Sequence, residues 1–130
     1  MAKVAMIVPS EKMLTLAKPM LESYSHVDMV LLEHVDPGDS QKALKIARSA
    51  IAQGCELIIA RGVQAMLIKS NTSVPVVEIQ LTAQEVGSEL LKMRELLNDP
   101  LPRIGLVILD NMVSDISRIN ELFPVELREY

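Results

Sequence analysis

The sequence is poor in cysteine and in aromatic residues. Among its 130 residues are one cysteine, no tryptophan, two tyrosines and one phenylalanine. A single cysteine, Cys55, cannot form a disulfide within the chain or supply a cysteine-rich zinc site, and such usage is typical of a reducing compartment. The few aromatic rings leave almost nothing to stack on nucleobases, and the formal net charge of -4 lacks the basic surface of a nucleic-acid-binding protein. We therefore expect no direct contact with DNA or RNA.

Long apolar runs are also missing. No run approaches the roughly 20 residues that a membrane-spanning helix needs. The N-terminal segment reaches Pro9 and Glu11 too early to form the apolar part of a secretory signal. The sequence therefore predicts a soluble, cytoplasmic protein that makes no membrane contact.

What the sequence does contain is a regular alternation of short aliphatic runs and longer amphipathic stretches. The aliphatic runs predict strands at residues 3–8, 27–32, 56–60, 74–79, 103–109 and 125–128. The amphipathic stretches predict helices at residues 11–25, 41–53, 62–71, 83–97 and 114–122. Pro19 predicts a kink or a split in the first helix. This order predicts an α/β fold, a flavodoxin- or Rossmann-like three-layer structure with a parallel sheet and helices on both faces.

The turn at residues 98–102 is the most linker-like segment of the chain, because it holds two prolines within five residues. We predict a first α/β lobe at residues 1–98. Residues 99–130 are then a linker and the opening β-α-β unit of a second lobe, or the edge of the same sheet. Such a unit is consistent with a completed sheet edge or with a chain cut off within a second lobe.

Candidate binding residues follow from the rule that ligands of open parallel sheets bind beyond the carboxyl ends of the strands. The polar residues and glycine predicted to lie there are Ser10, Arg61, Gly62, Gln80, Thr82, Asp110 and Asn111. Arg61 is the first candidate, because a guanidinium beside a helix N-terminus binds carboxylate or phosphate. Its alternative interpretation is a surface arginine paired with an acid such as Glu78.

The other candidates also have structural alternatives. Ser10 either binds an anion with the first helical turn or simply caps that helix. Asp110 and Asn111 either orient ligand hydroxyls or form an Asx turn. His34 lies near Glu33 and Asp36, but an extended strand end sends these side chains to opposite sides, so we expect no metal site.

Signatures of α/β enzymes are absent from the sequence. No GxGxxG follows the first strand, and no GxxxxGK[ST] motif occurs, so dinucleotide and P-loop sites are not predicted. No nucleophile with a base and no opposed acid–base pair stands out, so we expect no catalytic residue and no cofactor. Cys55 has the acidic neighbour Glu56 and directly precedes a predicted strand, so a buried, inert cysteine is expected.

The segment ELIIARGVQAMLIKSNTSVPVVEIQLTAQEVGSELL, residues 56–91, resembles the N-terminal sensory domain of the propionate-catabolism activators. These proteins are enhancer-binding bacterial transcription regulators that work with the alternative sigma factor. The resemblance rests on ARG followed by PVVEI, and it extends more loosely over the whole chain. The family usually has a second glycine and then Ser or Thr where this chain has Val63 and Gln64. After the fourth strand the family has a polar-Gly-Tyr-Asp pattern, whereas this chain has Ala-Gln-Glu at residues 83–85.

The resemblance implies a two-lobed fold similar to periplasmic sugar-binding proteins, with an effector in the cleft. In the namesake members that effector is a methylcitrate-type tricarboxylate, and its binding relieves inhibition of a downstream AAA+ ATPase module joined to a DNA-binding domain. The seven candidate residues would map to cleft-facing loops and to the crossover between lobes. The implied function is therefore an effector-sensing domain that binds a small anionic metabolite. Separately, we expect the chain to form a homo-oligomer. The alternatives are a small two-lobed racemase or isomerase that uses Cys55 or Asp110, and a non-catalytic dimerisation domain.

Overall fold

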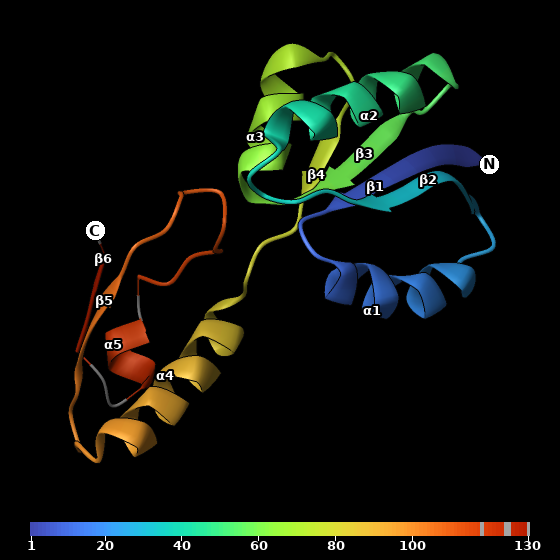
Figure 1. The fold of residues 1–130 in the computed structure, drawn as a ribbon. Coiled ribbons are helices and arrows are strands. Elements are labelled where there is room, and N and C mark those ends of the chain that lie inside the picture. Colours follow the sequence, from blue (N-terminus) through green and yellow to red (C-terminus); the bar gives the residue numbers. More distant parts are fainter. Residues whose placement is uncertain (118, 124–125, 130) are drawn as a thin grey trace. The chain divides into compact units, whose positions relative to one another are not determined.

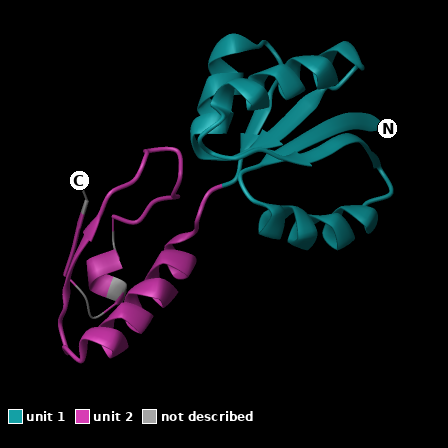
Figure 2. Cartoon of the chain, in the orientation of Figure 1, with its two compact units in different colours: residues 1–79 teal, residues 80–130 magenta. Residues whose placement is uncertain are grey.

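The computed structural model (Figure 1) describes residues 1–117, 119–123 and 126–129. The chain forms two compact units, Met1–Ile79 and Gln80–Tyr130, which Figure 2 shows in different colours. Among the helices in these described ranges, none is long and apolar enough to span a bilayer.

The first unit is a parallel α/β sandwich. Its strands are β1 (Ala2–Val8), β2 (Val27–His34), β3 (Leu57–Ala60) and β4 (Val76–Glu78), and its helices are α1 (Glu11–Glu22), α2 (Ser40–Ala52) and α3 (Gly62–Asn71). All neighbouring strands pair in parallel, in the order β2-β1-β3-β4. Helix α1 covers one face of the sheet, and α2 and α3 cover the other (Figure 1). This arrangement confirms the predicted three-layer α/β fold.

The sheet face under α2 and α3 holds the main core of the first unit. Successive residues of a strand point to opposite faces, and Ala5 and Ile7 of β1 join Ile58 and Ala60 of β3 on this face. The helices meet them largely with small residues, which allow close approach of helix and sheet. These residues are Ala43, Ala47, Ala50 and Ala65.

The opposite face is covered by α1. Val4, Met6 and Val8 of β1 are buried there, yet no residue of α1 itself is fully buried. Pro19 lies inside α1 without splitting it, and the helix ends at Glu22 rather than at the predicted residue 25. Ser23 caps this end, where its hydroxyl donates to the carbonyl of Met20 at 2.6 Å.

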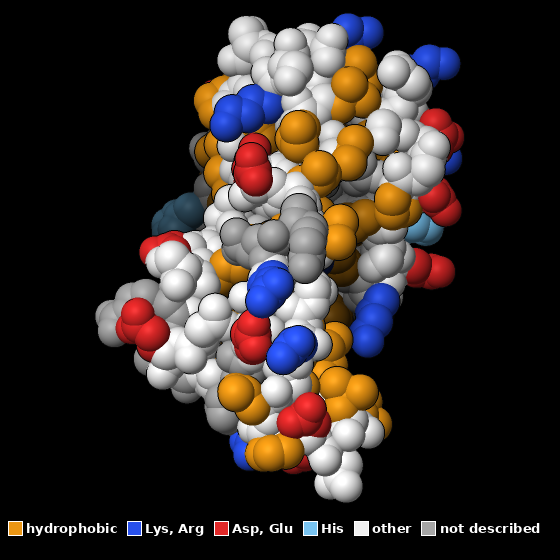
Figure 3. Space-filling model, turned by 90° about the vertical axis from the view of Figure 1, so that its left-hand side faces the viewer, with side chains coloured by type: hydrophobic (Ala, Val, Ile, Leu, Met, Phe, Trp, Pro, Cys, Tyr) orange, Lys and Arg blue, Asp and Glu red, His pale blue; other side chains and the backbone are white. Residues whose placement is uncertain are grey.

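The second unit is smaller. It contains α4 (Ala83–Leu97), β5 (Arg103–Leu106), α5 (Ile119–Leu122) and β6 (Glu126–Glu129), and β5 and β6 form a two-stranded parallel sheet. Its core is a cluster of aliphatic residues from these elements and from the segment before α5. The buried members are Val86, Leu90, Ile116, Ile119 and Leu127. Other apolar residues stay exposed, and Figure 3 shows hydrophobic side chains open to solvent on the side of the molecule that it presents.

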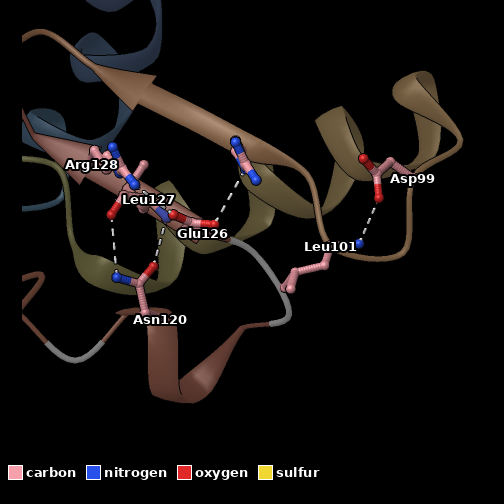
Figure 4. A network of polar contacts seen from close by, with 7 residues as sticks. Asp99, Leu101, Asn120, Glu126, Leu127 and Arg128 are labelled. Carbon is pink, nitrogen blue, oxygen red and sulfur yellow. Dashed lines mark hydrogen bonds and ion pairs between the residues drawn. The ribbon is translucent and has the colours of Figure 1, made fainter.

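A polar network holds β6 in place beside β5 and α5 (Figure 4). The Asn120 side chain accepts from the amide of Leu127 at 2.7 Å and donates to the Leu127 carbonyl at 3.2 Å. The Glu126 carboxylate lies 3.6 Å from Arg103 of β5 and 3.1 Å from Arg128. The Asn120 amide therefore satisfies both backbone groups of Leu127, as a neighbouring strand would.

The turn between α4 and β5 agrees with its proline-rich sequence. Asn98 ends α4 in the left-handed conformation, with φ of 50°. The Asp99 carboxylate then accepts from the amide of Leu101 at 2.9 Å (Figure 4). The left-handed backbone of Asn98 and the Asp99 side chain thus close a turn that continues into β5.

Several predicted elements are shorter in the structure. The predicted strand 103–109 ends at Leu106, and Val107 is 82% exposed. The predicted helix 114–122 is helical only from Ile119, because Ser114 pairs through its amide with the Leu81 carbonyl at 2.8 Å instead of starting a helix. The predicted strand 74–79 is reduced to Val76–Glu78. Residues 118 and 125 of these predictions lie outside the described residues.

The division into units falls after Ile79, whereas the sequence analysis predicted a boundary at residue 98. The difference concerns α4, whose apolar residues Val86 and Leu90 pack with Ile116, Ile119 and Leu127 of the second unit. A proline-rich turn is a strong local signal, but helix packing, which decides the division, is not visible locally.

Candidate anion-binding site

The candidate site lies at the carboxyl ends of β1 and β3 in the first unit. Strand β1 connects to β2 on one side, and β3 connects to β4 on the other side, so the strand order reverses between β1 and β3. Ligands of doubly wound sheets bind at such a switch point, because the loops diverge there and leave the strand ends open. Ser10 follows β1 at this point, and Arg61 follows β3.

The structure brings Ser10 and Arg61 together through the first turn of α1. Ser10 is the N-cap of α1, and its hydroxyl accepts from the amide of Met13 at 3.2 Å. The Arg61 guanidinium Nη1 lies 3.6 Å from the Sδ atom of Met13. The guanidinium is therefore beside the N-terminal turn of α1, where the helix dipole also favours negative charge.

The charge of Arg61 is not neutralised within the described residues. Its alternative partner, Glu78, lies 3.8 Å from Lys69 of α3, and no carboxylate in the described ranges forms an ion pair with Arg61. The thioether of Met13 is only a weak acceptor for a guanidinium that has five N–H donors. Arg61 thus keeps most of its donors for a further acceptor.

Gly62 and the start of α3 complete this edge. Arg61 is the N-cap residue of α3 and makes no side-chain capping bond, whereas α1, α2 and α4 are capped by Ser10, Asp39 and Thr82. Gly62 has φ of 57°, a left-handed conformation that side chains with a Cβ rarely adopt. The turn therefore needs glycine for its backbone.

Gln64 is a residue of this edge that the sequence analysis did not select. It is 2% exposed, and its Nε2 donates to the Val35 carbonyl at 2.7 Å, which ties α3 to the segment after β2. Its Oε1 atom has no hydrogen-bond partner among the described residues. The signal that could have found it is a polar side chain at a position where the helical pattern requires an apolar one.

The remaining candidates belong to the second unit. Thr82 caps α4 in a capping box, in which its hydroxyl accepts from the Glu85 amide at 3.2 Å and Glu85 Oε2 accepts from the Thr82 amide at 2.6 Å. Leu81 pairs with the loop after β5, since its amide donates to the Met112 carbonyl at 2.9 Å. This pairing brings the candidates Gln80 and Thr82 near Asp110 and Asn111.

Asp110 lines a hollow of about 410 Å³ together with Asp115 and Ser117. The backbone amide and the hydroxyl of Ser117 hold the pKa of the Asp115 carboxyl below its usual value. Two carboxylates at one hollow favour a cation or a ligand hydroxyl over an anionic group. Within this unit, the candidate residues therefore differ in chemistry from Arg61.

Cys55 is not one of the candidate binding residues. The side chain is buried, and its Sγ donates to the Leu57 carbonyl at 3.0 Å. A thiol that is buried and engaged with a backbone carbonyl lacks the electropositive, accessible surroundings of a reactive cysteine.

Comparison with known protein families matches residues 33–130 to the family described as propionate catabolism activator. The chain belongs to this family. The match covers the N-terminal sensory domain of these regulators, so the protein has a regulatory, sensory role, as the ARG and PVVEI segments predicted. Among curated proteins and among solved structures, the comparison finds no match.

Proposed function

We propose that this chain is the effector-sensing part of a bacterial sigma-factor-dependent transcription regulator, and that it binds a small anionic metabolite of carboxylate or phosphate type. Family membership supports the sensory role. The effector site is the edge formed by Ser10, Arg61 and Gly62, and Arg61 supplies the main charge contact. Gln80, Thr82, Asp110 and Asn111 of the second unit are proposed as further ligand-binding residues within that unit.

The observation that carries the proposal is the absence of an acidic partner for Arg61 in the described part of the chain. A half-buried guanidinium usually finds a carboxylate, because its desolvation is otherwise costly. Here it lies instead beside a thioether, at the switch point of the sheet and next to the first turn of α1. A bound anion would complete the hydrogen bonding of this guanidinium.

The site binds rather than reacts. Its side chains are a guanidinium, a capping hydroxyl and a glycine, which hold an anion but provide neither a nucleophile with a base nor an acid–base pair. We propose that occupancy shifts the population of the sensory domain between two states and thereby controls an AAA+ ATPase module and a DNA-binding domain elsewhere in the native protein. Such control requires only a few kcal/mol of differential affinity. In this proposal the protein acts in the cytoplasm as a homo-oligomer.

Isothermal titration of the chain with succinate, citrate and inorganic phosphate tests the proposal. Replacement Arg61→Ala should weaken the tightest of these anions about 10- to 100-fold, because a charge-assisted hydrogen bond is lost. The matched control is Arg48→Ala, which removes an exposed arginine from α2 on the opposite face of the sheet. Equal affinity in the Arg61→Ala protein and the wild type would remove Arg61 from the site.

A further inference from the structure

His34, the last residue of β2, lies at the same edge of the sheet as Ser10 and Arg61. The register of the parallel pair matches His34 with Val8, the last residue of β1. Val8 follows Ile7, which faces α2 and α3, so Val8 faces α1. Paired residues of neighbouring parallel strands point to the same face, so the exposed imidazole of His34 is also on the α1 face.

The backbone that carries His34 is held on both sides. Before the strand ends, β2 is paired with β1 as far as His34. Immediately after it, the Val35 amide donates to the Val8 carbonyl at 2.9 Å, and the Val35 carbonyl accepts from the buried Gln64 side chain at 2.7 Å. An exposed side chain on an anchored backbone is suited to binding, because little order has to be created when a ligand arrives.

Arg61 is on the same face, on the other side of β1. It contacts Met13 of α1, and it follows β3, which is the second neighbour of β1. With neighbouring strands about 4.8 Å apart, the ends of β2 and β3 are separated by roughly 10 Å, and the first turn of α1 starts from the strand between them. An anion bound at that turn has the Arg61 guanidinium on one side and the His34 imidazole on the other.

We propose that His34 is a second anion-binding residue of this site and that it receives a second anionic group of the same ligand. The inference rests on the proposed function, because it extends the site built around Arg61. The preferred ligand is therefore an anion with two separated anionic groups, held between the His34 imidazolium and the Arg61 guanidinium.

This assignment makes ligand affinity depend on pH. A histidine changes its charge between about pH 5 and pH 8, and only the imidazolium attracts an anion by its charge. Affinity should therefore be higher at the acidic end of this range and should fall as the proton is lost. The other charged residues that neighbouring elements carry near this edge are Glu11 and Lys12 of α1 and Asp36 of the following loop, whose Oδ1 accepts from the Gly38 amide at 2.8 Å. Glu33 points to the opposite face.

The test uses the 130-residue chain and two matched acids. Fumarate carries two carboxylates that stay ionised in this pH range, and crotonate has the same skeleton with a methyl group in place of one carboxylate. The wild type should bind fumarate about fivefold more tightly at about pH 6 than at about pH 8, and His34→Gln should abolish that difference. Crotonate affinity should be the same in the wild type and in His34→Gln. His26→Gln, which changes the chain's other histidine just before β2, is the control and should behave as the wild type.

Arg61→Ala separates the two proposals. If Arg61→Ala binds neither fumarate nor crotonate while His34→Gln binds fumarate as the wild type does, His34 is not a ligand-binding residue. The proposed site around Arg61 is then retained. If Arg61→Ala binds both acids as the wild type does, the proposed function fails and the inference fails with it. Absence of measurable fumarate binding to the wild type at about pH 6 also overturns the inference. Thermal melting of His34→Gln shows whether the exposed substitution leaves the fold intact.

Discussion

The two units of the chain differ in how completely helices cover their parallel sheets. In the first unit, helices lie on both faces of four strands, and every residue of β1 from Val4 to Val8 is buried. In the second unit, two strands pack against α4 and α5, and Leu96, Leu97 and Val107 remain largely exposed. Parallel sheets are normally covered on both faces, because their strands are apolar on both.

This difference bears on stability within one chain. Local stability follows the number of buried apolar contacts, so the second unit should open more readily than the first. A sensory domain that changes state on binding needs such a region of low stability, whereas its binding residues need a rigid support. The candidate residues Ser10 and Arg61 are attached to the better-covered sheet.

Truncating one core residue in each unit is the most direct test of this difference in stability between the units. Ile58→Ala in the first unit should lower the free energy of unfolding by about 4 kcal/mol, because Ile58 is fully buried between sheet and helices. Leu90→Ala in the second unit should lower the free energy of unfolding by about 2 kcal/mol, because the less completely covered core of this unit can relax around the truncated side chain. Hydrogen exchange should place the loss of protection in Met1–Ile79 for the first variant and in Gln80–Tyr130 for the second. Equal losses at both sites would contradict the comparison.

An effect smaller than that of Ile58→Ala and similar to that of Leu90→Ala is expected where α4 packs on Phe123. A Cβ added to Gly87 would overlap the Phe123 ring. Gly87→Ala should therefore destabilise the second unit by about 2 kcal/mol, although the same change in an exposed helix would stabilise it by about 1 kcal/mol. Urea denaturation measures the change, and Ser88→Ala is the exposed control on the same helix. Gly87→Ala should become favourable in a Phe123→Ala background, and a persistent loss there would show that the ring is not the cause.

The smallest effect concerns the start of α4. Thr82→Ala removes the hydroxyl that accepts from the Glu85 amide and should cost about 1 kcal/mol. Circular dichroism during thermal unfolding measures this loss. Thr82→Ser keeps the capping hydroxyl and should restore most of the stability. If the serine variant is as unstable as the alanine variant, the capping bond does not stabilise α4.

The sequence was sufficient for the elements that local pattern determines. The aliphatic runs that became β1 to β4 and the capped amphipathic stretches that became α1 to α4 were predicted, and the strand-end rule selected Ser10 and Arg61. The sequence did not reveal that Lys69 rather than Arg61 is next to Glu78, because the basic partner of Glu78 depends on how α3 packs beside β4.

Features that depend on register or on distant packing were missed. Whether His34 faces α1 depends on a shift in the β1–β2 register, where Val4 pairs with Met29 but Ala5 pairs with Leu31. No local pattern in either strand indicates this shift. The same reason applies to the short α5, since Ser114 is drawn into a bridge with Leu81 across the unit.

Only one residue, Arg61, stands between the end of β3 at Ala60 and the beginning of α3 at Gly62. A linker of several residues can absorb a change at its centre through small rotations of its other residues, but a single linking residue cannot. Strand β3 is an inner strand of the sheet and α3 covers the face opposite α1, so the two backbone dihedral angles of Arg61 set the direction in which the helix leaves the strand. A change in either of these dihedral angles therefore redirects α3 relative to the sheet, because no further linking residue can compensate for it.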